Sequence, residues 1–138
     1  MKKVLILTLS LITLSAVACH DRPVTFNDLP QKAQQFINTH FKNIGVLSAK
    51  FDDGNYEVIL KNGTEIEFSR QGEWKDVDCH TTAVPSAIIP AAIRDYVKAQ
   101  FPDNIIVKIE RDYNGYDIEL DNDLDLKFDK NGNYLYID

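Results

Sequence analysis

The sequence is poor in the residues that mark several specialised protein classes. Its 138 residues include only two cysteines, five prolines and six glycines. Two cysteines are too few for a disulfide-dense scaffold, and so little glycine and proline excludes collagen-like and low-complexity chains. Positive charge is also scarce, because 15 Lys and Arg stand against 21 Asp and Glu, for a net charge of −6. This acidity argues against nucleic-acid binding, which depends on clustered Lys and Arg.

The sequence also lacks the motifs by which most catalytic sites are found. It has no nucleophile elbow, P-loop, HExxH zinc motif, CxxC pair or dinucleotide-binding fingerprint. His40 lies beside Phe41 in an expected helix, which favours a boundary position over a catalytic base. Asp78, Cys79 and His80 include soft metal ligands, but adjacent side chains in an extended chain point apart, which argues against zinc. We therefore expect a protein that is not an enzyme and needs no cofactor.

The only long apolar run is at the N-terminus. Two lysines precede the uncharged residues 4–18, and a polar stretch begins just after Cys19. This order predicts a secretory signal peptide over residues 1–18, since the apolar run is shorter than the roughly 20 residues of a membrane span. Its removal leaves 120 residues and, with both lysines lost, a net charge of −8. The mature protein is expected in the periplasm or cell envelope.

The residue after the predicted cleavage point leaves two interpretations open. Cleavage before Cys19 is typical of bacterial lipoproteins, although Ala16 stands where their motif usually has leucine. In that case Cys19 carries the lipid, this anchor is the only contact with a membrane, and Cys79 is a lone, neutral thiol. Ala16 and Ala18 equally fit ordinary signal peptidase, and a soluble periplasmic protein would then have Cys19 free or paired with Cys79. We favour the lipoprotein.

An internal repeat is the most informative pattern, because residues 29–78 align without a gap on residues 89–138. The identities concentrate at aromatic, proline and turn positions. The pattern predicts one supersecondary unit used twice, with an N-terminal segment at 19–28 and a connector at 79–88. The identical pairs are Pro30/Pro90, Phe41/Phe101, Asp52/Asp112, Tyr56/Tyr116, Leu60/Leu120, Asn62/Asn122, Phe68/Phe128, Gly72/Gly132 and Asp78/Asp138.

Each repeat begins with a helical pattern and continues with strand patterns. Apolar residues first recur every three or four positions, with Pro30 and Pro90 in the first turn of each expected helix. Asn27 or Asp28 is the expected cap of the first helix. The period then changes to two, which indicates strands with one buried and one solvated face. We therefore expect an α+β fold, in which each repeat is a helix followed by a four-stranded antiparallel meander.

Turn chemistry predicts how the strands pair. Asn114-Gly115 is expected to form a two-residue turn that places Arg111 opposite Ile118, and residues 54–55 are expected to form the matching turn of the first repeat. Three-residue loops are expected at 121–123 and 130–132, and at the corresponding residues 61–63 and 70–72. The loop at 130–132 would place Phe128 opposite Tyr134 and hold Gly132 in a left-handed conformation.

Several motifs carry a family resemblance. They are Leu29-Pro30 with Phe36-Ile37 and Phe41, residues 72–79 leading into Val84-Pro85, Ile89-Pro90 through Val97, Lys108 to Arg111, and Phe128 to Gly132. With these motifs nearly the whole mature chain resembles the PepSY-like, β-lactamase-inhibitor-like proteins secreted by Bacteroidetes-type bacteria. The resemblance implies a tandem architecture like that of the β-lactamase inhibitor protein, and a periplasmic or envelope location. Some relatives are described as calcium-regulated, but no inhibitory or ligand residue carries over by position.

The outward faces of the two predicted sheets are expected to form one long, charged surface. Carboxylates on neighbouring strands repel each other, so a cation or a basic partner would stabilise this surface. We expect a non-catalytic envelope module that binds an unidentified protein or peptide here, with inhibition as one outcome. An ordinary solvated face that keeps the protein soluble is the alternative. The candidate binding residues are Glu57, Glu65, Glu67, Asp117, Glu119, Asp125 and Lys127.

A second hypothesis is a calcium-responsive periplasmic module that uses the acidic second repeat. Asp121, Asp123 and Asp125 have the spacing of the first ligands in an EF-hand. Leu126 stands where that loop needs glycine, and Gly132 where it needs glutamate. Asp and Asn are also common in hairpin turns for conformational reasons, so a plain turn is the competing interpretation.

Overall fold

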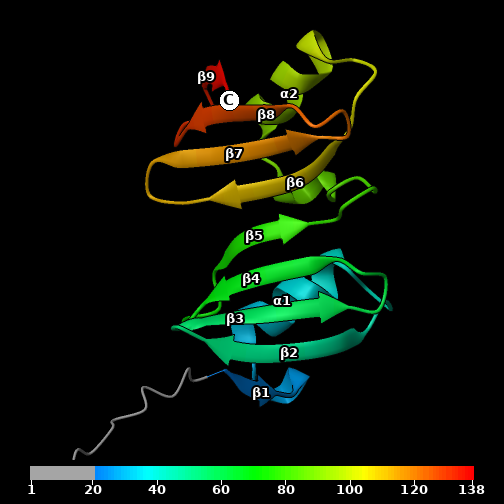
Figure 1. Cartoon of the computed structure of the whole chain (residues 1–138), viewed down its shortest axis with the longest axis vertical. Helices are drawn as coiled ribbons and strands as arrows, with labels where there is room; N and C mark the ends of the chain where they lie inside the picture. The colour runs from blue at the N-terminus through cyan, green and yellow to red at the C-terminus, as the bar shows by residue number, and fades with distance from the viewer. Residues whose placement is uncertain (1–20) are drawn as a thin grey trace, which may run out of the picture.

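The computed structural model describes residues 21–138, so the predicted signal peptide and Cys19 lie outside the described residues. In the described part, two helices lie behind one antiparallel sheet of nine strands (Figure 1). The strands follow one another across the sheet in chain order, from β1 to β9. No helix in this part is long and apolar enough to cross a membrane. Two helices packed on one antiparallel sheet confirm the expected α+β class.

After β1 (Arg22–Val24), the same order of elements occurs twice, and we call the two sets the first half and the second half. The helices α1 and α2 begin 60 residues apart, as do β3 and β7. The first half consists of α1 (Gln31–His40), β2 (Val46–Asp52), β3 (Asn55–Leu60), β4 (Glu65–Ser69) and β5 (Trp74–Asp78). The second half consists of α2 (Ala91–Gln100), β6 (Ile106–Arg111), β7 (Gly115–Leu120), β8 (Asp125–Asp129) and β9 (Tyr134–Ile137).

Both helices begin directly after a proline. Pro30 and Pro90 are the N-cap residues, with φ of −54° and −53°. The expected capping of α1 by Asn27 or Asp28 is wrong, because residues 26–28 form a separate 3₁₀ turn. Within that turn the Asp28 carboxylate accepts a hydrogen bond from the backbone N–H of Thr25 at 2.7 Å, which satisfies a donor of the 3₁₀ turn rather than one of α1.

The two-residue turns lie one position earlier than expected. Arg111 pairs with Tyr116, not with Ile118, and in the first half the turn is at residues 53–54. In the second half, local hydrogen bonds favour this position of the turn: the Asp112 carboxylate accepts hydrogen bonds from the N–H groups of Asn114 and Gly115. The three-residue loops are confirmed where they were expected, with Phe128 opposite Tyr134, and Gly132 is left-handed at φ +82°.

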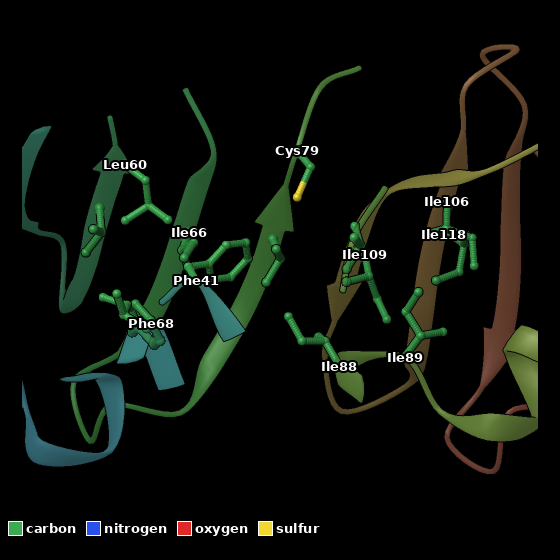
Figure 2. Close-up of a cluster of buried hydrophobic side chains, with 14 of the residues drawn as sticks. Phe41, Leu60, Ile66, Phe68, Cys79, Ile88, Ile89, Ile106, Ile109 and Ile118 are labelled. Carbon is green, nitrogen blue, oxygen red and sulfur yellow. The ribbon is translucent and has the colours of Figure 1, made fainter. Parts of the chain in front are cut away.

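β5 and β6 join the two halves into one sheet and one core. Val77 on β5 lies opposite Ile109 on β6, and both are fully buried. A single cluster of buried apolar side chains runs from α1 to α2, and Figure 2 shows side chains of both halves in it, from Phe41 and Phe68 to Ile118. Cys79 is a free, buried thiol in this cluster. Burial raises the pKa of that thiol, which keeps it neutral.

Candidate functional site

The helices cover one side of the sheet, and we call the other side the open face. Because successive strand residues alternate between the two sides, cross-strand pairing aligns the outward side chains into two rows. The first row is Lys50, Glu57, Glu67, Asp76, Glu110, Asp117 and Lys127, and the second is Ile59, Glu65, Asp78, Lys108, Glu119 and Asp125. All seven residues predicted for the binding face lie in these rows.

The open face has too few cations to neutralise its carboxylates. Ion pairs join Lys50 to Glu57 at 3.1 Å and Lys127 to Asp117 at 2.6 Å, near the two ends of the first row. Five successive residues of that row are acidic, each opposite the next: Glu57, Glu67, Asp76, Glu110 and Asp117. Like charges in directly opposite positions destabilise a sheet, so this arrangement has a cost in the isolated protein.

Asp76, in the middle of this row, carries a further cost, which is burial. Its Oδ2 is 3.4 Å from the Lys108 Nζ, while its buried Oδ1 has no hydrogen-bond partner among the described residues. Burial raises the pKa of Asp76 to about 6; Lys108 opposes this rise, and the carboxylates of Glu110 and Asp78 add to it. Asp76 also lines a shallow pocket of about 280 Å³ over β3 to β6, together with Glu57, Glu65, Glu67, Asp78 and Lys108. Sequence reasoning did not include Asp76 among the binding-face residues and did not predict this pocket.

Next to this pocket, Glu65, Asp78 and His80 bring potential metal ligands together. One ligand atom from each lies within 4.8 Å of the others, and in the described part of the chain this is the only such group. His80 Nδ1 is 3.3 Å from Asp78 Oδ1, and His80 Nε2 is 4.0 Å from Glu65 Oε2. Cys79, the neighbour of His80 in the sequence, points away from this group and is buried in the core, whereas His80, whose backbone is left-handed at φ +57°, lies against Asp78.

The structure does not bring the three predicted calcium ligands together. Asp121 Oδ1 accepts hydrogen bonds from the Asn104 side-chain amide at 2.8 Å and from the Ile105 N–H at 3.2 Å. Asp123 is at the tip of the β7–β8 hairpin with φ +64°, and Asp125 starts β8 on the open face. Within residues 21–138 these carboxylates form no group with ligand spacing. A calcium site there remains a prediction.

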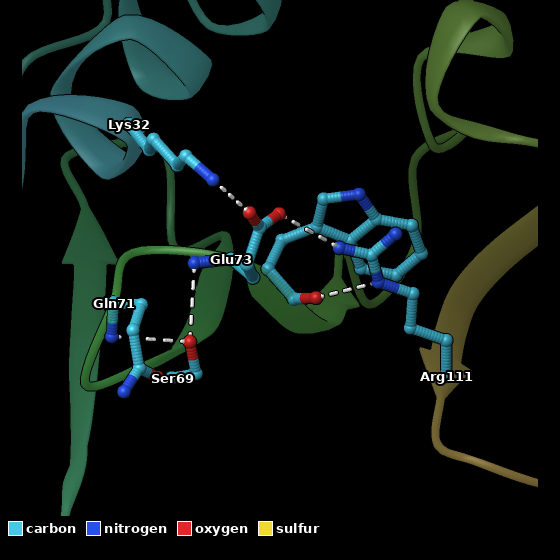
Figure 3. Close-up of polar contacts among 6 residues, drawn as sticks. Lys32, Ser69, Gln71, Glu73 and Arg111 are labelled. Atoms are coloured by element: carbon cyan, nitrogen blue, oxygen red, sulfur yellow. Dashed lines mark hydrogen bonds and ion pairs between the residues drawn. The ribbon is translucent and has the colours of Figure 1, made fainter.

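A cluster of polar and aromatic contacts ties the two halves together on the side of the sheet that carries the helices (Figure 3). The guanidinium of Arg111, at the end of β6, lies 4.1 Å from the centre of the Trp74 ring at the start of β5. Arg111 Nε donates a hydrogen bond to the Trp74 carbonyl at 2.7 Å, and Arg111 Nη2 is 3.6 Å from the Glu73 carboxylate. Glu73 also pairs with Lys32 on α1, so the cluster connects a helix with strands of both halves.

His40 has no surroundings that indicate catalysis. It is the last residue of α1, half-buried, with its ring 4.7 Å from the Phe36 ring. Burial lowers the pKa of His40. The expected boundary position is confirmed.

Comparisons with known proteins identify the family. A family model described as "Putative beta-lactamase-inhibitor-like, PepSY-like" matches residues 54–136. A solved structure from Bacteroides thetaiotaomicron, described as a "putative calcium-regulated periplasmic protein", is 46% identical with a TM-score of 0.83, covering 86% of this chain and 96% of the other.

Two similar structures come from Bacteroides vulgatus. One, described as a "putative periplasmic protein from DUF2874 family", is 42% identical with a TM-score of 0.83, covering 88% of this chain and 98% of the other. The second, described as a "putative periplasmic protein of unknown function", is 37% identical with a TM-score of 0.83, covering 86% of this chain and 98% of the other. No curated protein matches. The chain is thus a periplasmic or cell-envelope protein that belongs to the PepSY-like, β-lactamase-inhibitor-like family.

Proposed function

We propose that this protein is a non-catalytic periplasmic module that binds a protein or peptide through the open face of its sheet. One observation carries the proposal: Glu57, Glu67, Asp76 and Glu110 stand opposite one another on neighbouring strands. A surface that only had to stay soluble would mix charges of both signs. A partner with Lys or Arg side chains would replace repulsion by attraction across the row.

Two further features support binding at this face. The pocket over β3 to β6 is a depression in this surface that a side chain of the partner can enter. Ile59 lines it and offers an apolar contact among the carboxylates. The half-buried carboxylate of Asp76 has an oxygen without a hydrogen-bond partner in the described residues, which a donor from a partner would satisfy. We expect the partner to bind through a segment rich in Lys or Arg. If that segment belongs to the partner's own functional site, binding would inhibit the partner.

We also infer that the two halves are copies of one unit, in a tandem arrangement like that of the β-lactamase inhibitor protein. The matching bounds of α1 and α2 and of β3 and β7 support this. On this view the units are residues 29–78 and 89–138, the connector is 79–88, and the open face is composite. A partner would then contact both units, with the β5–β6 junction at the centre.

Capture from a periplasmic extract tests the binding proposal. The open-face variant E57Q/E67Q/E119Q removes three negative charges from the rows. The matched control D53N/D95N/D103N removes three from exposed positions in turns and on α2. We expect the wild type and the control to retain the same protein and the open-face variant to lose it. Equal retention by all three would show that the open face is not the binding surface.

A calcium response is the second candidate, and the description of the Bacteroides thetaiotaomicron structure favours it. Calcium takes six to eight oxygen ligands. Glu65 and Asp78 would supply carboxylate oxygens, but His80, the third member of that group, fits a borderline metal such as zinc better. Asp121, Asp123 and Asp125 would need the β7–β8 hairpin to rearrange. Calcium ions that bind loosely to several carboxylates of the open face would not need the hairpin to rearrange.

Thermal unfolding in calcium chloride and in magnesium chloride tests this candidate. A ligand at about 100 times its dissociation constant stabilises the folded state by roughly 2.7 kcal/mol, so a specific site raises the melting temperature in calcium and much less in magnesium. The variants E65Q/D78N and D121N/D125N separate the two places. An equal response to both salts indicates screening alone, and no response removes the candidate.

A further inference from the structure

The strand β9 is an edge of the sheet that presents apolar side chains to water. Leu135, Tyr136 and Ile137 are 54%, 54% and 47% exposed. β9 pairs with β8 and with no other strand of the described residues, so one side of its main chain has no partner strand. Edge strands usually carry charges or proline, which discourage pairing with another chain. Residues 134–137 contain neither.

The equivalent strand of the first half shows how such an edge is covered. β5 lies 60 residues before β9, and its outer edge pairs with β6 in antiparallel fashion. Where β9 has Leu135 and Tyr136, β5 has Lys75 and Asp76. The covered strand is thus the charged one and the uncovered strand is the apolar one. This is the reverse of what an edge that stays in water requires.

The opposite edge of the sheet is β1, a strand that is poorly suited to pairing with another chain. β1 pairs with β2 in the register that β5 adopts on β6: Pro23 lies opposite Lys50, as Asp76 lies opposite Glu110, the residue 60 positions after Lys50. β1 therefore occupies the place that the last strand of a preceding unit would take. It is three residues long and contains a proline and the charged Arg22, which do not favour a further strand.

We propose that β9 is an interface for a second copy of this chain, in which two β9 strands pair antiparallel about a two-fold axis. Each copy has one such edge, since β1 at the other edge does not favour a further strand, so the contact ends at two copies. Antiparallel pairing of a strand with itself places the same side chains on both sides of the contact. Residues 134–137 are uncharged, so the acidity of the chain does not act directly at the contact. β9 and β1 lie at opposite ends of the molecule (Figure 1).

Sedimentation over a range of protein concentrations tests the proposal with the mature chain. Because the strand is short, we expect weak association, with the average mass rising from one copy towards two between about 10 µM and about 1 mM. The variant L135K/I137K should stay at one copy throughout. The control L47K/Y113K adds the same charge at apolar positions that are 66% and 88% exposed and lie off β9, and it should associate like the wild type.

Three outcomes overturn the proposal: a wild type that stays at one copy, a β9 variant that still forms pairs, or growth beyond two copies. Amide hydrogen exchange of the wild type gives a readout that needs no variant, should L135K/I137K fail to fold. The proposal expects the outer edge of β9 to become protected from exchange as the protein concentration rises, while β1 does not change. Protection that is independent of concentration would contradict it.

Discussion

At the scale of single residues, Asp76 shows how the fold opposes one of its own charges. Its pKa is 3.8 when unperturbed and about 6 in the folded protein, with burial as the main cause. Between these values the folded state binds more protons than the unfolded state. The free energy of unfolding therefore falls as the pH rises from 3.8 to about 6, and the loss persists above that range.

Replacing the charge should remove this loss. Relative to the wild type, D76N is expected to gain on the order of 2 kcal/mol of stability between pH 3.8 and about 6 and to keep it at neutral pH. Urea unfolding of both proteins across this range measures the difference. In K108M, Asp76 loses the cation that lowers its pKa, so the loss of stability should extend to higher pH. A constant difference between D76N and the wild type would contradict the assignment to Asp76.

Gly115 provides a second prediction at this scale, because β7 approaches β8 closely there. A Cβ atom at Gly115 would lie 2.0 Å from the carbonyl oxygen of Phe128, whereas one at Gly54 meets no atom within 4 Å. Urea unfolding should show that G115A loses about 3 kcal/mol or more, since backbone must move. G54A, strained only by its φ of +84°, should lose about 1 kcal/mol. Equal losses of stability in G115A and G54A would show that the close approach at Gly115 does not contribute to the cost of the substitution.

At the scale of elements, the junction of β5 and β6 depends on the contact between Arg111 and Trp74. R111M keeps much of the stem but loses the cation over the ring and the hydrogen bond to the Trp74 carbonyl. We expect a loss of about 1–2 kcal/mol in the free energy of unfolding. Trp74 is the only tryptophan, so its fluorescence reports on the same contact. R111K keeps the charge but not the planar guanidinium, so it should show a smaller loss of stability than R111M but not wild-type stability. Wild-type stability in R111K would show that only the positive charge at this position matters.

The sequence predicts those elements whose causes are local. Helical periodicity, the prolines before the helices and the loop ending at Gly132 are each contained within a few residues, and all of them are found. The two-residue turns lie one residue earlier than expected in both halves: Gly115, expected in the turn, instead begins β7, where it approaches the carbonyl oxygen of Phe128 closely. β1 was missed because three residues carry no periodicity, and only pairing with β2 defines the strand.

The same distinction applies to the candidate site. Strict alternation along the strands was enough to place the seven predicted residues on one face. The group of Glu65, Asp78 and His80 needed two facts that alternation does not contain: that Glu65 lies opposite Asp78, and that His80 turns back towards both. The environment of Asp76 likewise depends on β6 covering β5, a contact between the two halves.

At the scale of the whole molecule, the two halves treat the same position of the open face differently. Glu67 in the first half corresponds to Lys127 in the second, and Glu67 lies between the acidic Glu57 and Asp76. Copying the lysine into the first half should therefore stabilise the protein. We expect E67K to gain about 0.5–1 kcal/mol, net of the lost pair with Lys75, and E67Q to gain less.

Salt provides the check on that prediction. Raising sodium chloride from about 10 mM to about 0.5 M should stabilise the wild type, because salt screens repulsion between exposed charges. Urea unfolding at each salt concentration measures the free energy of unfolding. The advantage of E67K should shrink over the same range. An advantage that is independent of salt would indicate packing rather than charge, and a destabilised E67K would show that the pair of Glu67 with Lys75 outweighs the repulsion.

The order of strands across the sheet also determines how the chain can fold. Every strand from β2 to β9 pairs with the strand just before it in the sequence, so no strand waits for a distant partner, and the entropy of closing long loops is small throughout. A chain that enters the periplasm from its N-terminus can add strands in the order in which they emerge. Its unfinished sheet then has at each moment a single growing edge, and β9, the last strand added, leaves that edge apolar.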